Sequence, residues 1–211
     1  MNSNQREGGA ESTPQALPDL PGTFYVVVMT ASVGGLAALS EILGSLPADF
    51  KAAIAVVQHR GQTTPGMFED ILNQRTALCV REAQEGDRLE PGVAHVAPYG
   101  LHLISNPDGS LSLSNSPKVK FARPAGDRLF ESAAMSLASR VIGVVLTGGD
   151  GDGSDGIQLI KEMGGMVIAQ DQSTSKEFSM PLSAIKTGDV DFILPLEKIA
   201  PALMTMVGGT V

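Results

Sequence analysis

Apolar residues along this chain follow two alternating patterns from residue 24 onward. Largely apolar runs over 24–29 and 52–59 are typical of strands that are buried on both faces of a parallel sheet. The stretch between them, 35–46, instead repeats leucine and isoleucine at helical spacing, and a proline follows it. The same alternation returns in the second half of the chain. It predicts an α/β fold, a doubly wound and mainly parallel β-sheet with helices on both faces.

The pattern also predicts where the individual elements lie. The expected strands cover residues 24–29, 52–59, 77–83, 141–147, 166–170 and 190–195. The expected helices cover residues 35–46, 66–74, 127–139, 154–163, 181–187 and 196–206. Between residues 92 and 114 the pattern changes to short runs, two of which flank Pro107-Asp108-Gly109. Asp-Gly between alternating runs is a strong hairpin signal, so we expect a small antiparallel hairpin insert over this segment.

Length and composition narrow the class of protein. The 211 residues suffice for one sizeable α/β domain, and 43% of them are hydrophobic and 18% charged, as in ordinary globular proteins. The formal net charge of −8 argues against nucleic-acid binding, because that affinity comes mainly from clustered lysine and arginine. No apolar stretch approaches the roughly 20 residues that a membrane-spanning helix needs, so we expect no membrane insertion.

The start of the chain and its single cysteine bear on location. Residues 1–22 lack the apolar core of a signal peptide and are typical of a flexible N-terminal tail, so we expect the domain to cover 23–211. One cysteine, Cys79, excludes an internal disulfide and fits a reducing compartment. Its apolar neighbours predict a buried and inert thiol. We therefore expect a cytoplasmic protein.

Residues with reactive side chains follow three of the predicted strands. Ser32 follows the first strand, His59 the second, and the loop GGDGDGSDG follows the strand at 141–147. Ligands of such sheets bind beyond the carboxyl ends of the strands. Serine, histidine and aspartate therefore arrive at one edge of one sheet. This is the set from which a serine hydrolase takes its nucleophile, general base and orienting acid.

Each of these residues also has a simpler interpretation. A serine before two glycines is often a helix N-cap, and a lone histidine at a strand end is often a polar surface residue. The loop has the Asp-x-Asp-x-Ser spacing of a calcium loop, but the bidentate glutamate at the twelfth position is missing, so we expect no metal. Composition does not separate Asp150, Asp152 and Asp155 as the orienting acid. Asp152 lies between two glycines that free the backbone there, whereas Asp155 falls in the first turn of the next helix.

Seven segments, in a fixed order, carry a resemblance to a known family. They are TASVGGLAAL, VVQHR, EPGVAHVAPYGLHL, LFESAA, VIGVVLTGGDGDGSDG, VIAQD and SMPLSAI. Together they resemble the catalytic domain of the CheB-type protein-glutamate methylesterases of bacterial chemotaxis, from about Phe24 to Val207. The resemblance implies a Ser-His-Asp triad that hydrolyses methyl esters of receptor glutamates, and that also deamidates receptor glutamines in some members. It places the triad on Ser32, His59 and Asp152.

Residues beside the expected nucleophile are candidates for binding the oxyanion and the substrate. The backbone amides at the start of the helix after Ser32, together with the helix dipole, can stabilise a developing oxyanion, which assigns Val33, Gly34 and Gly35. The resemblance adds Gly149, at an oxyanion-donor position where methionine is common in the family. The backbone N–H that would donate to the oxyanion is present with glycine as well as with methionine.

The first interpretation is therefore a serine esterase that acts on glutamate γ-methyl esters. Its expected partners are the cytoplasmic helices of methyl-accepting chemoreceptors or related signalling proteins, and it needs no cofactor. The alternative is a non-catalytic or rewired signalling domain on the same scaffold, favoured by the acidic glycine-rich loop and by the absence of a receiver domain. Regulated family members carry such a domain, whereas about 22 residues precede the first strand here, so we expect no phosphorylation control in cis. An esterase for a non-receptor ester is a third possibility.

Overall fold

The computed structural model describes residues 24–61 and 67–208. The N-terminal tail expected at 1–22 lies outside these residues. Within them, the α/β fold predicted from the sequence is confirmed. No helix of the described residues is long and apolar enough to cross a membrane.

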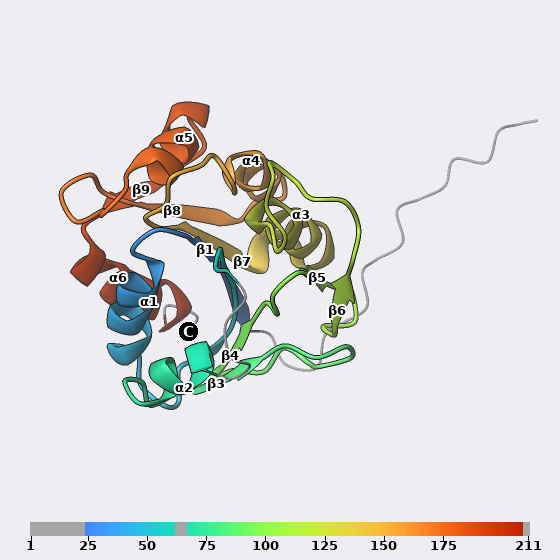
Figure 1. Cartoon of the computed structure of the whole chain (residues 1–211). Helices are drawn as coiled ribbons and strands as arrows, with labels where there is room; N and C mark the ends of the chain where they lie inside the picture. The colour runs from blue at the N-terminus through green and yellow to red at the C-terminus, as the bar shows by residue number, and fades with distance from the viewer. Residues whose placement is uncertain (1–23, 62–66, 209–211) are drawn as a thin grey trace, which may run out of the picture.

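A parallel sheet of seven strands runs through the centre of the structure (Figure 1). The strands lie in the order β3-β4-β2-β1-β7-β8-β9. Their bounds are β1 Tyr25–Ala31, β2 Ala52–Gln58, β3 Cys79–Glu82, β4 Val93–Val96, β7 Val141–Val145, β8 Met166–Gln170 and β9 Phe192–Leu194. The inner strands β1, β2 and β7 are buried along nearly their whole length, which is why their sequences are almost uninterruptedly apolar.

Helices cover both faces of this sheet (Figure 1). The α-helices of the described residues are α1 Gly35–Gly44, α2 Met67–Asn73, α3 Gly126–Leu137, α4 Ser154–Glu162, α5 Ser179–Thr187 and α6 Leu196–Gly208. Helices α1, α2 and α6 pack on one face, and α3, α4 and α5 pack on the other. Successive side chains of a strand point to opposite faces, so Val27 and Met29 of β1 join the first core and Val26 and Val28 the second.

The antiparallel insert is smaller than the sequence predicts. Strands β5 (His102–Ser105) and β6 (Leu111–Ser114) form the expected hairpin, which is tied to α3 by Ser136 Oγ donating to the Ser105 carbonyl at 2.9 Å. The prediction was wrong for Val93–Val96, which is strand β4 and pairs in parallel with β2 and β3. Its connection from β3 contains no helix, so the strand–helix–strand pattern that marks a parallel strand is missing there.

The prediction of a buried thiol was also wrong, because Cys79 is exposed. Cys79 begins β3, which lies at the edge of the sheet and buries only alternate side chains. Leu78 and Val80 face the core, and the residue between them faces outward. Period-two alternation on an edge strand therefore decides the exposure of the thiol, rather than the apolar character of its neighbours.

Strand β1 lies where the strand order reverses. The chain passes from β1 to β2 on one side, and β7 pairs with β1 on the other. In doubly wound sheets, the connections on the two sides of such a point diverge and leave a crevice beyond the carboxyl ends of the strands. The residues that follow β1, β2 and β7 therefore meet in one place.

Close packing of α3 against α4 sets the position of the loop after β7. A Cβ on Gly156 would lie 2.5 Å from the Phe130 Cβ and 3.1 Å from the Asp127 carbonyl oxygen. The buried Asp127 Oδ1 also accepts the N–H groups of Asp155 at 3.1 Å and Gly156 at 3.0 Å. The start of α4, and with it the end of the acidic loop, is thereby fixed on the start of α3.

Gly156→Ala should lower the free energy of unfolding by about 1–3 kcal/mol, because the two helices leave no room for a Cβ. Gly208→Ala is the matched control, since Gly208 is also helical but a Cβ there would meet nothing within 4 Å. Its helix propensity should leave the stability unchanged or raise it by up to about 1 kcal/mol. Urea unfolding followed by circular dichroism measures both variants, and equal effects would contradict the close packing.

Candidate functional site

Ser32 directly follows β1 at the crevice. Its N–H donates to the Thr147 carbonyl at 3.0 Å, which fixes it beside the end of β7. The N-cap residue of α1 is Gly34, with φ of +85°, and no side chain caps the helix, so Ser32 is not the N-cap that its sequence context also allowed. Among the described residues, the half-buried Ser32 hydroxyl has no hydrogen-bond partner. It is therefore available for chemistry.

Gln58, at the end of β2, ties the serine and histidine loops together. Its buried side-chain amide donates to the Ser32 carbonyl at 2.9 Å and to the His59 carbonyl at 2.8 Å. A Cβ on Gly35 would collide with the Gln58 Oε1 and come within 2.7 Å of the Ala31 Cβ. The absence of a Cβ at Gly35 therefore allows the Gln58 side chain to pack against the first turn of α1.

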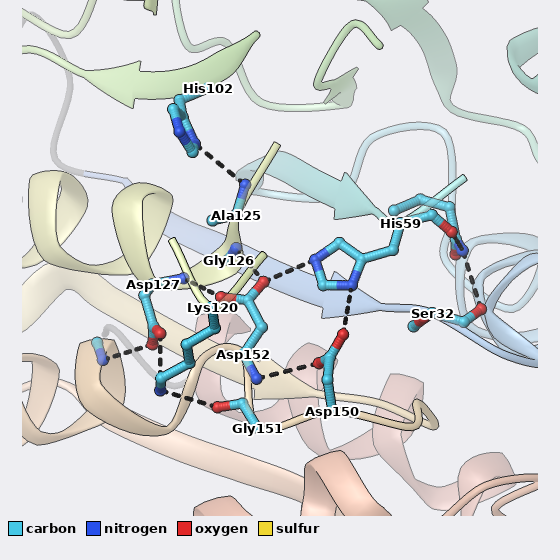
Figure 2. A network of polar contacts seen from close by, with 12 residues as sticks. Ser32, His59, His102, Lys120, Ala125, Gly126, Asp127, Asp150, Gly151 and Asp152 are labelled. Carbon is cyan, nitrogen blue, oxygen red and sulfur yellow. Dashed lines mark hydrogen bonds and ion pairs between the residues drawn. The ribbon is translucent and has the colours of Figure 1, made fainter. Parts of the chain in front are cut away.

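The imidazole of His59 lies between two carboxylates (Figure 2). Its Nε2 is 2.8 Å from Asp152 Oδ2, and its Nδ1 is 3.1 Å from Asp150 Oδ2. The third acid of the loop, Asp155, instead pairs with Lys120 at 3.1 Å. Geometry thus distinguishes three acids that composition could not, and it brings two of them, rather than one, to the histidine.

The Asp152 carboxylate is fully buried at the N-terminus of α3 (Figure 2). The N–H of Gly126 donates to Oδ2 and the N–H of Asp127 donates to Oδ1, the latter at 3.0 Å. Gly126 permits this contact, because a Cβ there would lie 2.5 Å from Thr30 Oγ1 and 3.1 Å from Asp152 Oδ2. A helix N-terminus presents free N–H groups and a favourable dipole to an anion, so Asp152 is held both as a charge and in orientation.

These contacts set the protonation states of the site. Burial lowers the pKa of His59, but the two carboxylates outweigh it and raise that pKa from 6.5 to about 9. Burial works to raise the pKa of Asp152, whereas the hydrogen bonds from His59 and the α3 amides lower it below its ordinary value. The pKa of Asp150 is lowered in the same way, since the bond to His59 outweighs burial. The described arrangement therefore pairs an imidazolium with two carboxylates.

Lys120 fixes the loop from the opposite side (Figure 2). Its ammonium lies 2.9 Å from Asp127 Oδ2 and donates to the Gly151 carbonyl at 3.0 Å and to Ser154 Oγ at 2.8 Å. Burial lowers the pKa of Lys120, but Asp127 and Asp155 raise it more, so the group stays cationic. This lysine holds the segment around Asp152 against the start of α3.

The candidate oxyanion donors differ in availability. The N–H of Gly35 donates to the Ser32 carbonyl at 2.9 Å and is occupied while that turn is intact. Among the described residues, the N–H groups of Val33, Gly34 and Gly149 have no acceptor. Three of the four candidates therefore remain open to a substrate oxygen.

Ser32 lies between two hollows of the surface. One is mostly apolar, has a volume of about 550 Å³, and is lined by residues of α1 and α2 that include Leu36, Phe68 and Ile71. The other has a volume of about 820 Å³ and is lined by Ser32, His59 and Asp150 together with Tyr99 and several basic side chains. The second hollow brings the reactive groups to one accessible space.

The remaining histidines lie away from the reactive centre. His95 is buried and accepts from the Arg81 guanidinium at 3.0–3.1 Å, and burial is the main cause that lowers its pKa to about 4. His102 is buried and accepts the N–H of Ala125 at 3.2 Å, next to the start of α3. Tyr99 borders the larger hollow, whereas His102 is not among the residues that line it. No cluster of three or more metal-binding side chains occurs among the described residues.

Several supporting residues were missed by reasoning from the sequence. Asp150 was set aside in favour of Asp152, and Gln58, Lys120 and Gly126 were not considered. Gln58 and Gly126 had weak signals, a polar residue ending an apolar strand and a glycine opening a helix. Lys120 had none, because it approaches from a segment without regular structure.

Comparison with known proteins places this geometry in a family. The family model described as CheB methylesterase matches residues 27–203. A protein-glutamate methylesterase/protein-glutamine glutaminase of Anaeromyxobacter dehalogenans is 42% identical over 195 residues, which are 92% of this chain and 57% of that protein. The protein-glutamate methylesterase FrzG of Myxococcus xanthus is 38% identical over 196 residues, 92% of this chain and 59% of that one. The chain thus spans somewhat more than half the length of these two relatives.

A solved structure agrees with the sequence comparison. The crystal structure of the Thermotoga maritima CheB methylesterase catalytic domain superposes with a TM-score of 0.85 at 36% identity. The match covers 88% of this chain and 100% of that one. Sequence and structure agree over nearly the whole described region, and the chain belongs to the CheB methylesterase family.

Proposed function

We propose that this protein hydrolyses γ-methyl esters of glutamate residues on chemoreceptor-type signalling proteins, with Ser32 as nucleophile. The observation that carries the proposal is the meeting of Ser32, His59 and the buried Asp152 beyond the ends of β1, β2 and β7. The relatives with this fold are named protein-glutamate methylesterases, which supports the same reaction.

The chemistry follows from the contacts of the histidine. Asp152 accepts from Nε2, so Nδ1 is the ring nitrogen left to take the proton of Ser32. Ser32 Oγ then attacks the ester carbonyl, and the open N–H groups of Val33, Gly34 and Gly149 supply donors for the oxyanion. The protonated His59 gives its proton to the departing methanol. Water, deprotonated by the same imidazole, attacks the acyl-enzyme and frees the glutamate carboxylate.

The role of Asp152 is orientation and charge stabilisation. It holds the imidazole by one nitrogen and stabilises the imidazolium that forms during the reaction, without taking a proton itself. Its two bonds to α3 amides favour the ionised state throughout. The same machinery serves an amide substrate, with ammonia leaving in place of methanol, and the name protein-glutamine glutaminase on relatives supports deamidation as a second activity.

The charge around the larger hollow supports a receptor-like partner. Although the chain has a formal net charge of −8, the hollow is lined by Arg60, Lys118, Lys120 and Arg123. Arg60 and Lys120 are paired with carboxylates of the chain. Lys118 and Arg123 are therefore the cations left to meet a helix surface that carries glutamates beside the methylated one. Cytoplasmic helices of methyl-accepting receptors fit this description, and they would place the enzyme in the cytoplasm.

The alternative of a non-catalytic signalling domain finds less support. A binding module needs neither an unbonded serine hydroxyl nor a histidine oriented by a buried carboxylate. An esterase for another small ester would keep the serine and the oriented histidine, but it would not release methanol from a methylated receptor fragment.

Ser32→Ala should reduce methanol release from a methylated receptor fragment by about 10³-fold or more, because no other group can form the acyl-enzyme. The Ser32 hydroxyl makes no hydrogen bond within the described structure, so the melting temperature should stay within a few degrees of the parent. Methanol release and thermal unfolding are measured on the same preparation. Full activity in a folded Ser32→Ala protein would contradict the mechanism.

Asp152→Asn should lower the turnover number by about 10³–10⁴-fold, because an amide cannot stabilise the imidazolium and favours the wrong tautomer. Asp155→Asn is the matched control, as it removes the same charge from the same loop at a side chain that pairs with Lys120 and not with His59. That variant should lose about tenfold or less, or about 1.4 kcal/mol of barrier. Assays of both variants on one methyl-ester substrate test the assignment. The assignment of Asp152 is wrong if Asp155→Asn, rather than Asp152→Asn, loses most of the activity.

A further inference from the structure

Two carboxylates on one imidazole define its protonation state. Both ring nitrogens of His59 lie within hydrogen-bond distance of an aspartate oxygen, at 2.8 Å and 3.1 Å. An ionised carboxylate can only accept hydrogen bonds, so both nitrogens must carry a proton to satisfy both contacts. The described arrangement is therefore that of an imidazolium, which has no lone pair with which to take a proton from Ser32.

The nitrogen that Asp150 occupies is the one that the reaction needs. Asp152 holds Nε2 from the buried side, so Nδ1 alone can serve Ser32. In the structure Nδ1 is bonded to Asp150, and the Ser32 hydroxyl is bonded to nothing among the described residues. The orienting acid is therefore in place, while a second acid occupies the ring nitrogen that would serve Ser32.

We propose that Asp150 is a positioning residue that holds His59 in a resting ion pair and must leave Nδ1 before Ser32 can be activated. This inference rests on the proposed esterase function and adds to it a control within the site itself. Removing the Asp150 charge then frees the base, whereas removing the Asp152 charge disables it.

The two aspartates are held very differently, which identifies the one that moves. The Asp152 side chain is fully buried and accepts two N–H groups of α3 in addition to the histidine. The Asp150 side chain is 38% exposed and lines the larger hollow. Within the described part of the chain, it otherwise accepts only the Asp152 N–H, at 3.1 Å. Asp150 can therefore swing into the hollow at the cost of a single ion pair, and a substrate that enters the hollow competes for its place.

The other charges around His59 are already paired and do not replace Asp150. Arg60, the next residue, pairs with Glu69 at 2.9 Å and with Glu82 at 3.5 Å. Lys120 acts on the loop from behind, where Asp127 and Asp155 meet its charge. The remaining cations that border the hollow are Lys118 and Arg123, and neither forms an ion pair with a carboxylate of the described residues.

The direction in which activity changes with pH follows from the protonation of His59. Its pKa of about 9 means that about one molecule in a hundred carries a neutral imidazole at pH 7. Activity of the parent enzyme should therefore rise with pH up to about pH 9. Loss of the Asp150 charge removes one of the two contacts that raise this pKa, so the rise should move to lower pH.

The test compares the parent with Asp150→Asn, which keeps an oxygen for the Asp152 N–H but loses the charge. Asp155→Asn is again the matched control. With ¹³C-labelled histidine, the chain gives three imidazole signals, and His59→Gln identifies the one from His59. His95 and His102 both have lowered pKa values and titrate well away from it. We expect the His59 pKa to fall by about one unit or more in Asp150→Asn and to stay unchanged in Asp155→Asn.

A second measurement follows the rate of methanol release from pH 6 to 10 in the parent, Asp150→Asn and Asp155→Asn. Asp150→Asn should release methanol about tenfold faster than the parent at pH 7, with the two rates converging near pH 9–10. An unchanged His59 titration in Asp150→Asn overturns the proposal, as does a lowered pKa with an unchanged or slower rate at pH 7. If no protein releases methanol, the proposed function fails, while the titration still decides whether Asp150 holds His59.

Discussion

The burial of the Asp152 carboxylate at the start of α3 is the contact on which the site depends. A buried carboxylate is costly unless it is hydrogen-bonded, and here two backbone N–H groups and an imidazole satisfy it. That requirement explains Gly126, which lets the start of α3 approach the carboxylate, while Gly156 lets α4 begin against α3.

The parallel sheet brings the other site residues to Asp152. Ser32 and His59 reach the same place because β1 and β2 are parallel neighbours, and the acidic loop reaches it because β7 flanks β1 on the other side. Gln58 then bonds the carbonyls of both Ser32 and His59, so the two loops hold a fixed relation to each other. The relatives that share this fold are named for an esterase activity, which fits a site built from strand ends.

The sequence predicted the fold well and the site in part. Strands buried on both faces need continuous apolar runs, and amphipathic helices need apolar residues at helical spacing. Both kinds of element are therefore recognisable in the sequence. Strand β4 was misassigned because no helix precedes it, and the exposed Cys79 because an edge strand buries only alternate residues. The contact of Asp150 with His59 joins side chains 91 residues apart, through a loop whose path no local pattern encodes.

The central claim, that Ser32 is a nucleophile served by His59, is tested most directly by covalent labelling. The chain is treated with a fluorophosphonate at pH 9, where a large share of His59 is neutral, then digested and analysed by mass spectrometry. We predict a single adduct on the peptide that contains Ser32, absent from a folded His59→Gln variant because the serine then has no base. No adduct, or an adduct on another serine that persists without His59, would contradict the account.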